Sequence, residues 1–288
     1  MGAAELRAAS VLFDGFASDP RLDHPEGVAV HPDDGSIWCG GEAGQIYRVD
    51  PEAGSIEIVA RTGGFCLGVA FAHDRALLVC DQDRRAVLRL PPGASEPAVL
   101  SEGAPGLPLR LPNACAVAAD GAVFVSDSRA QGDPGPAIFR VGPDGATELW
   151  CDAPIHFANG LALTADGSAL LVVESWERRI LQIPVRADGG AGAPEVLVEL
   201  PGTVPDGVAV AADGSTWVAC YEPSQVLRVD PSGTVAVIAA DPDGHVLCHP
   251  TNLGFRGEQV VVANLGRWHL SVLDAGARGV PVPPERRR

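Results

Sequence analysis

The sequence contains no lysine, because all 21 basic residues among its 288 are arginine. A lysine amine is required to form a Schiff base with a carbonyl substrate or to attach pyridoxal phosphate, so both kinds of chemistry are excluded. Positive charge as a whole is scarce, and the formal net charge is −16. Nucleic acids and anionic membranes bind to basic faces, so neither is expected as a partner. We expect a small-molecule substrate, and the sequence leaves the oligomeric state open.

Motifs of several common enzyme classes are also missing. The sequence has no Gly-x-Ser-x-Gly elbow, no His-Glu-x-x-His zinc motif, no phosphate-binding glycine loop and no EF-hand spacing. The seven cysteines are odd in number and include no Cys-x-x-Cys pair, which predicts buried free thiols rather than disulfides. Residues 1–13 lack the basic and long apolar segments of a secretion signal, and a cytoplasmic location is therefore expected.

A short phrase that leads into an apolar run recurs six times along the chain. Aligned on one small or apolar residue, the six copies are separated by 41, 46, 46, 47 and 46 residues. The aligned positions are Gly27, Gly68, Ala114, Gly160, Gly207 and Leu253. A repeat of this length is typical of a β-propeller, in which each repeat forms one four-stranded blade. The sequence therefore predicts an all-β, six-bladed propeller that occupies residues 1–288 as a single domain.

The ends of the repeat array predict how the ring closes. The sixth repeat contains three expected strands, at residues 252–255, 259–264 and 269–273, followed by a proline-rich tail. One additional strand is expected before the first repeat, at residues 9–13. If this N-terminal strand becomes the outer strand of the sixth blade, both open sheet edges are covered. Within the blades, Asp-Gly pairs such as Asp34-Gly35 and Asp166-Gly167 predict two-residue hairpin turns.

The residue before the aligned position carries a side-chain oxygen in five of the six repeats, and we call these positions the anchors. The anchors are Glu26, Asn113, Asn159, Asp206 and Asn252, with Leu67 in the second repeat. The innermost strands of a propeller begin around one end of its axis, so the anchors are expected to converge. Carboxylate and amide oxygens without sulfur suit a hard divalent cation such as Ca²⁺, Mg²⁺ or Mn²⁺. The alternative is that Asn and Asp before Gly only satisfy the geometry of a turn.

The phrases around the anchors resemble the successive motifs of the gluconolactonase/regucalcin family over essentially the whole chain. The matching stretches are Pro25-Glu26-Gly27, Leu111-Pro112-Asn113, Ala158-Asn159-Gly160-Leu161 and Val204-Pro205-Asp206-Gly207. The resemblance implies a divalent-metal-dependent hydrolase that opens a lactone or a related ester. It implies that Glu26, Asn159 and Asp206 hold the metal, with Ca²⁺ as the first candidate and Mg²⁺, Mn²⁺ or Zn²⁺ as alternatives. It also implies that Asp206 is the catalytic base and that Asn113 contacts the metal or the substrate.

The third repeat departs from the pattern of that family. The family often has Arg-Pro-Asn-Asp at this place, whereas the chain has Leu111-Pro112-Asn113-Ala114. Arg110 lies one residue before the position of that arginine, so the departure counts against a sugar lactone as the substrate. Further candidates for substrate binding are Asn252, His249 and Trp268, which are expected near the same end of the axis.

Other stretches, at residues 124–128 and 157–163, resemble the strictosidine-synthase-like propellers. These share the architecture, but the enzyme that names the group condenses an amine with an aldehyde without a metal. A metal-free condensing or cyclising enzyme is therefore an alternative function, and a phosphotriesterase-like hydrolase and a non-catalytic binding propeller are two more. The presence of both Glu26 and Asp206 favours the metal-dependent hydrolase.

Overall fold

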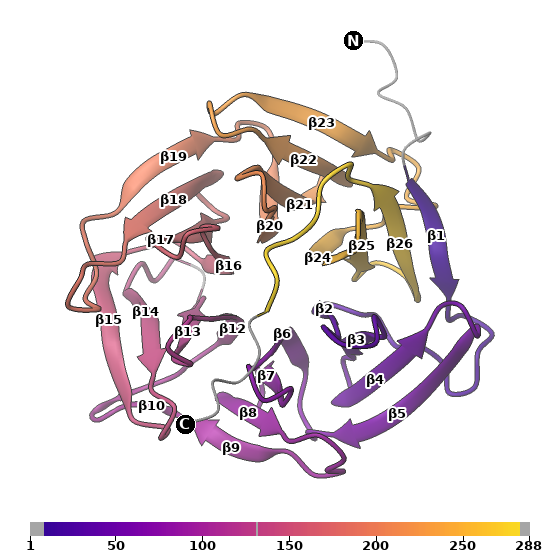
Figure 1. Cartoon of the computed structure of the whole chain (residues 1–288), viewed down its shortest axis with the longest axis horizontal. Helices are drawn as coiled ribbons and strands as arrows, with labels where there is room; N and C mark the ends of the chain where they lie inside the picture. Colours follow the sequence, from indigo (N-terminus) through magenta and orange to yellow (C-terminus); the bar gives the residue numbers. More distant parts are fainter. Residues whose placement is uncertain (1–8, 131, 283–288) are drawn as a thin grey trace.

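In the computed structural model, which describes residues 9–130 and 132–282, the chain forms strands and connecting loops only. Twenty-four of the 26 strands in this part make six sheets of four, and β10 (Gly103–Ala104) and β11 (Leu107–Pro108) form a small additional hairpin. The six sheets stand around a common centre like the blades of a propeller (Figure 1). The predicted all-β, six-bladed propeller is confirmed. Within the described residues, no helix is present that could cross a membrane.

Each of the first five blades is built from consecutive strands, ordered from the centre outwards. The first two blades contain β2 (Val28–Val30), β3 (Ile37–Gly40), β4 (Gln45–Asp50) and β5 (Ser55–Arg61), then β6 (Cys66–Phe71), β7 (Leu77–Asp81), β8 (Ala86–Leu90) and β9 (Ala98–Ser101). The third contains β12 (Pro112–Val117), β13 (Val123–Asp127), β14 (Pro136–Val141) and β15 (Thr147–Pro154). The fourth and fifth contain β16 (Ala158–Leu163), β17 (Ala169–Glu174), β18 (Arg179–Pro184) and β19 (Glu195–Glu199), then β20 (Val204–Val210), β21 (Thr216–Glu222), β22 (Gln225–Val229) and β23 (Val235–Ala240).

The sixth blade confirms the predicted closure of the ring. Its inner three strands are β24 (Pro250–Arg256), β25 (Gln259–Asn264) and β26 (His269–Asp274), and its outer strand is the N-terminal β1 (Ala9–Asp14). β1 pairs antiparallel with β26, from Ala9 opposite Leu273 to Asp14 opposite His269. Figure 1 shows β1 lying beside β26. An edge that would otherwise expose unpaired backbone groups is thereby covered.

The position of a strand within its blade explains its composition. The second strands β7 and β17 are buried along their whole length and are nearly continuous runs of Leu and Val, because a blade packs against them on both faces. The outer strands β19 and β23 carry more exposed positions, including the valines at 196, 235 and 237. The burial of a strand therefore falls from the second strand of a blade to its outer edge.

The predicted two-residue hairpin turns are wrong. At Asp34-Gly35 the hydrogen bond that closes the loop joins His31 N to Ser36 O at 2.8 Å, so four residues lie between the bonded pair. Only the glycine has a positive φ, 70° at Gly35, whereas a two-residue turn of the predicted type needs it at both positions. The aspartate instead accepts a hydrogen bond from the backbone two residues later, with Ser36 N to Asp34 Oδ1 at 2.9 Å. Asp-Gly thus marks the turn correctly, but through an Asx turn.

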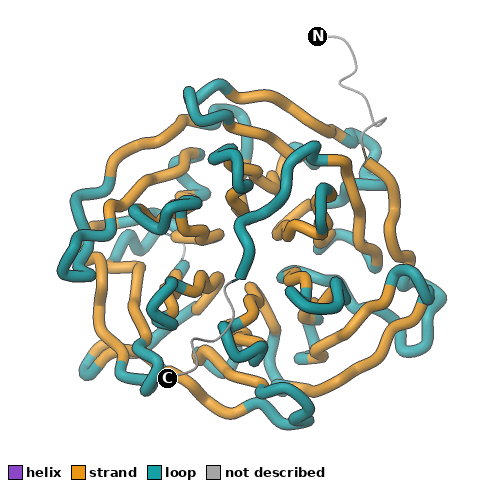
Figure 2. The backbone as a smooth tube through the Cα atoms, in the orientation of Figure 1, coloured by secondary structure: helices purple, strands orange, loops and turns teal. Residues whose placement is uncertain are grey.

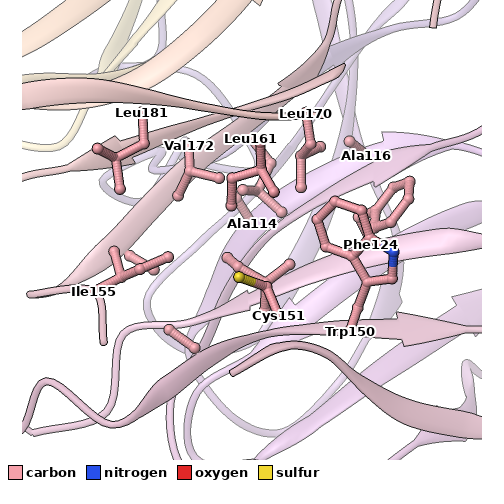
Figure 3. Close-up of a cluster of buried hydrophobic side chains, with 14 residues drawn as sticks. Ala114, Ala116, Phe124, Trp150, Cys151, Ile155, Leu161, Leu170, Val172 and Leu181 are labelled. Carbon is pink, nitrogen blue, oxygen red and sulfur yellow. The ribbon is translucent and has the colours of Figure 1, made fainter. Parts of the chain in front are cut away.

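Neighbouring blades are held together by hydrophobic clusters between their faces. Figure 3 shows the cluster between the third and fourth blades, where Phe124 and Trp150 meet edge to face with ring centroids 4.7 Å apart. Leu161 and Leu170 of the fourth blade pack against the same cluster. All seven cysteines are free, and six of them are buried, as predicted; Cys248 is half-buried.

The two ends of the propeller axis differ, and we call them the anchor end, where the inner strands begin, and the far end. At the far end, apolar residues from successive inner strands line a cavity of about 410 Å³. After β26 the chain runs across the centre of the ring (Figures 1 and 2). There Ala212 N donates to Arg278 O at 2.7 Å, and Gly279 to Val282 line the same cavity. The C-terminal segment therefore covers the far end.

Candidate active site at the anchor end

A β-bulge positions the anchor inside the inner strand in five of the six blades, whereas Glu26 lies just before β2. In the third blade, Pro112 is paired with Asp127 and Cys115 with Val125, so the two residues between them face a single residue of β13. The same irregularity occurs in β6, β16, β20 and β24. A bulge bends the strand and redirects a side chain, and bulges are frequent beside active sites. Apart from Glu26, the anchors therefore lie within strands, and for these the alternative that they only shape turns is not supported.

The glycines that follow the anchors are explained by the close approach of neighbouring inner strands. A Cβ atom added to Gly160 would lie 2.6 Å from the carbonyl oxygen of Asp206, and one added to Gly207 would lie 2.4 Å from that of Thr251. At these positions the inner strand thus rests against the next blade so closely that a side chain would collide with its backbone. The glycines are explained by this packing, and the residues before them are free to serve another purpose.

The register of β24 corrects the alignment of the sixth repeat by one residue. Pro250 is paired with Asn264 and Leu253 with Val262, so Thr251 and Asn252 occupy the bulge. Compared with Asn159 and Gly160, which occupy the bulge of β16, Thr251 takes the place of an anchor and Asn252 that of a glycine. The prediction of Asn252 as the sixth anchor is therefore wrong in register. Asn252 still reaches the site, because its Nδ2 donates to Glu26 Oε2 at 3.4 Å.

Three of the anchors carry a buried side-chain oxygen that has no hydrogen-bond partner within the described part of the chain. They belong to different blades and are Asn113 Oδ1, Asn159 Oδ1 and Asp206 Oδ1. Buried polar atoms are nearly always bonded, so unpaired acceptors on adjacent strands indicate a missing positive ligand. Glu26 is buried beside them. Oxygen donors with two carboxylates fit a hard divalent cation, and no sulfur is among them.

The two carboxylates are unstable as bare anions. Burial raises the pKa of Asp206 to about 8, against a smaller opposing effect of the Asn159 side chain. Burial also raises the pKa of Glu26 well above its usual range; the nearby charge of Asp206 adds to this rise, and the hydrogen bond from Asn252 opposes it. In the described part of the chain, no basic side chain pairs with either carboxylate. Protons or a cation must neutralise them, since a buried unpaired charge is costly.

Hydroxyl groups fix the anchors from the neighbouring blade. Ser126 Oγ donates to Asn159 O, Ser175 Oγ to Pro205 O and Thr251 Oγ1 to Glu26 O, each at 2.7 Å. Asn159 Nδ2 donates to Ser175 Oγ at 3.2 Å, which holds the amide so that its Oδ1 is the unpaired atom. These supporting residues were not found from the sequence. For Ser126 and Ser175 the signal was a serine next to the residue that ends a second strand, whereas Thr251 lies in the inner strand β24.

A second group missed from the sequence holds the loops that lead into the anchors. Asp127 accepts hydrogen bonds from the backbone of Arg110 and of Leu111, both at 2.8 Å. Glu174 accepts one from His156 N at 2.6 Å, and Asn264 accepts one from Cys248 N at 2.9 Å. All three end the second strand of their blade. A polar residue that repeatedly ends an apolar strand was the available signal.

The predicted substrate-binding residues Arg110, His249 and Trp268 lie around the anchors without a hydrogen bond to them. Arg110 is exposed, and its guanidinium lies 3.8 Å from Asp133. The ring of His249 stacks on Tyr221 at 4.3 Å, and its Nδ1 is 3.1 Å from Tyr221 O. Trp268 packs 5.0 Å from His24. The structure thus brings together Glu26, Asn159, Asp206 and Asn252, with Asn113 on an adjacent strand.

Comparison with known proteins agrees with this geometry. Residues 24–260 match the family described as the SMP-30/Gluconolactonase/LRE-like region. The pentonolactonase XacC of Haloferax volcanii is 30% identical over 214 residues, which cover 73% of this chain and 70% of the relative. STRICTOSIDINE SYNTHASE-LIKE 6 of Arabidopsis thaliana is 27% identical over 215 residues, covering 69% of this chain but only 56% of the relative. The chain therefore spans little more than half of that relative's length.

The fold also matches a solved structure of a protein from this group. The calcium-binding protein regucalcin of Agrobacterium tumefaciens superimposes with a TM-score of 0.75 at 19% identity, over 92% of this chain and 94% of that protein. At this identity the likeness establishes the six-bladed architecture. The family match and the pentonolactonase relative, by contrast, rest on the sequence itself.

Proposed function

We propose that this chain, which belongs to the SMP-30/gluconolactonase/LRE-like family, is a divalent-metal-dependent hydrolase that opens a lactone or a related ester. The observation that carries the proposal is the set of unpaired buried oxygens of Asn113, Asn159 and Asp206 beside the carboxylate of Glu26. A structural role alone would have paired these oxygens with protein donors. The sequence relationship to a pentonolactonase supports the same reaction class.

Glu26, Asn159 and Asp206 would hold the ion, and Ca²⁺ is the first candidate because all donors are oxygen. When bound, the ion supplies Lewis-acid polarisation of the scissile carbonyl and stabilisation of the developing oxyanion. Two carboxylates match its two positive charges. The support from Ser175 to the Asn159 amide, at 3.2 Å, keeps the donor oxygen directed to the site without rearrangement.

Asp206 would take a proton from the attacking water as general base. The water oxygen forms a bond to the carbonyl carbon, and the ester C–O bond then breaks. The proton passes from Asp206 to the leaving alkoxide, so the product is a hydroxy acid and the carboxylate is regenerated. Asn113 would hold the substrate, because its amide is buried and its Oδ1 is unpaired.

The test is a lactone panel on purified protein from which metals have been removed with a chelator. We expect hydrolysis to be lost and to return on addition of Ca²⁺. The rate is followed by pH-stat titration and compared with the rates in Mg²⁺, Mn²⁺ and Zn²⁺. Activity that a chelator leaves intact would favour the metal-free condensing class, which the strictosidine-synthase-like relatives represent. Hydrolysis of phosphotriesters but of no lactone would favour the phosphotriesterase-like hydrolase instead.

A further inference from the structure

A second ring of residues lies just outside the anchors, and we call it the collar. It consists of the residue two positions before each anchor: His24, Phe65, Leu111, Phe157, Val204 and His249. All six collar residues are half-buried, whereas the residues between them and the anchors are all buried. The collar is therefore the accessible layer next to the buried oxygens. It contains no carboxylate, amide, hydroxyl or guanidinium group.

Three collar residues are held in place by a second ring each. His24 packs on Trp268 at 5.0 Å, Phe157 on Trp176 at 5.1 Å, and His249 stacks on Tyr221 at 4.3 Å. The three collar residues also share a left-handed backbone, with φ of 33°, 61° and 48° respectively. Left-handed conformations are unfavourable for such residues and concentrate at functional sites. A preorganised aromatic surface loses little entropy when a ligand binds to it.

These rings stand out in a chain that has few of them. Aromatic residues make up only 5% of the sequence, yet Trp176 and Trp268 both lie beside the collar. Trp176 is among the exposed large hydrophobic residues of the protein. Exposed rings around a buried polar site are typical of ligand contact.

Several charged residues in and beside the collar are engaged with one another. His156 Nδ1 lies 3.0 Å from Glu177, and Arg110 lies 3.8 Å from Asp133. His24 Nδ1 lies 3.3 Å from Asp23. Apart from the imidazoles of His24 and His249, the collar side chains offer no hydrogen-bonding group to a ligand with many hydroxyl groups, which would lose much of its water there without replacement. An anionic ligand would meet a protein with a net charge of −16.

We propose that the collar binds the non-reacting part of the substrate, and that this part is uncharged and aromatic or aliphatic. Phe157 and Trp176 are then specificity-determining residues. The substrate would be an aryl- or alkyl-substituted lactone or ester, rather than a polyhydroxylated sugar lactone. This inference rests on the proposed hydrolase for the identity of the reacting group, while the apolar preference rests on the collar itself.

The experiment compares kcat/KM for dihydrocoumarin, an aryl lactone, with that for glucono-δ-lactone, using the Ca²⁺-loaded protein. We expect the wild type to prefer dihydrocoumarin by roughly tenfold or more, and Phe157→Asn to reduce that preference by about tenfold through a higher KM. Asparagine suits the left-handed backbone, so the variant removes the ring without adding strain. Phe157→Tyr retains the ring and should keep the preference. Trp176→Ala is the second test variant. Its matched control is Trp38→Ala, which removes a half-buried ring that packs on Phe71.

The outcomes separate the two proposals. A preference for glucono-δ-lactone, or a ratio that Phe157→Asn leaves unchanged, would overturn the collar while the hydrolase stands. If neither lactone is hydrolysed with any metal, the proposed hydrolase activity is wrong. A measurement of ligand binding then tests the proposal for the collar. The probe is then 3,4-dihydro-2-quinolinone, the lactam analogue of dihydrocoumarin, followed by tryptophan fluorescence. Saturable binding that Phe157→Asn abolishes would support the collar, and absence of binding would overturn it.

Discussion

The same six inner strands build both ends of the axis, and the two ends follow opposite rules. At the anchor end, bulges leave side-chain oxygens of Asn113, Asn159 and Asp206 buried and unpaired. A few residues further along, the strands are regularly paired, their side chains are apolar, and the C-terminal segment covers them. The far end is mostly an apolar core, although His73 Nε2 is buried beside its cavity without a hydrogen-bond partner in the described residues. The anchor end, by contrast, gathers unpaired acceptors from three adjacent inner strands. The first residues of a strand can therefore form a functional site while its remaining residues form part of the hydrophobic core.

The unpaired acceptors have a cost that the rest of the blade offsets. An unsatisfied buried polar group costs about 1–3 kcal/mol, and buried charges cost more. Clusters between all neighbouring blades supply the compensating hydrophobic burial, and β1 closes the ring. Unpaired acceptors that gather on three adjacent inner strands at one end of a regular repeat point to function.

Exchanging one carboxylate at each end is the strongest test of this difference. We expect Asp206→Asn to lower kcat on a lactone by a factor of roughly 10² or more, because it keeps an oxygen donor but removes the base. Asp166→Asn makes the same chemical change at the far end, where Asp166 lines the cavity, and should leave kcat unchanged. Near-normal turnover of Asp206→Asn with metal bound would show that the base lies elsewhere, with His249 as the next candidate.

Metal affinity should separate the ligand role of the anchor end from its role as base. Glu26→Gln removes one negative charge, so we expect Ca²⁺ to bind on the order of 10–100-fold more weakly, with activity partly restored by excess Ca²⁺. Calorimetric titration of the chelator-treated protein measures the affinity. Asn252→Ala is the matched variant, since it removes the 3.4 Å hydrogen bond to Glu26 and leaves the carboxylate. Equal affinities for wild type and Glu26→Gln would remove Glu26 from the ligand set.

The anchor end should also give the metal-free protein an unusual response to pH. Asp206 has a folded-state pKa of about 8, so the folded state retains its proton where an unfolded aspartate, with a pKa of about 4, has lost it. Stability from this group is therefore complete below about pH 4 and is lost as the pH rises towards 8. We expect Ca²⁺ to raise the melting temperature more at pH 8 than at pH 5. Calorimetry of wild type against Asp206→Asn isolates the contribution, and equal shifts at both pH values would contradict it.

The sequence predicted the regular part of the molecule better than the irregular part. The repeat spacing and the unpaired strand at residues 9–13 were enough to predict six blades and their closure, because both follow from periodicity. The sixth anchor was misplaced because the sequence alignment put Asn252 in the place that Thr251 occupies, and the pairing of β24 was needed to fix this register. Asp127 and Ser175 were missed because their role depends on backbone atoms of another loop or blade, which a single sequence does not display.

Removing the cover of the far end should have the smallest effect on chemistry. Deleting residues 277–288 abolishes the bonds from Ala212 N to Arg278 O and from Val280 N to Val210 O, and it uncovers Phe255 where Gly279 packs. With two hydrogen bonds and some apolar burial lost, we expect the melting temperature to fall by roughly 2–6 °C. We expect kcat/KM on a lactone to stay within about twofold of the wild type, because the anchors and their hydroxyl supports are untouched. A truncated protein that stays folded by circular dichroism but loses metal-dependent turnover would show that the two ends are coupled through the inner strands. The separation of site and structure along each strand would then be wrong.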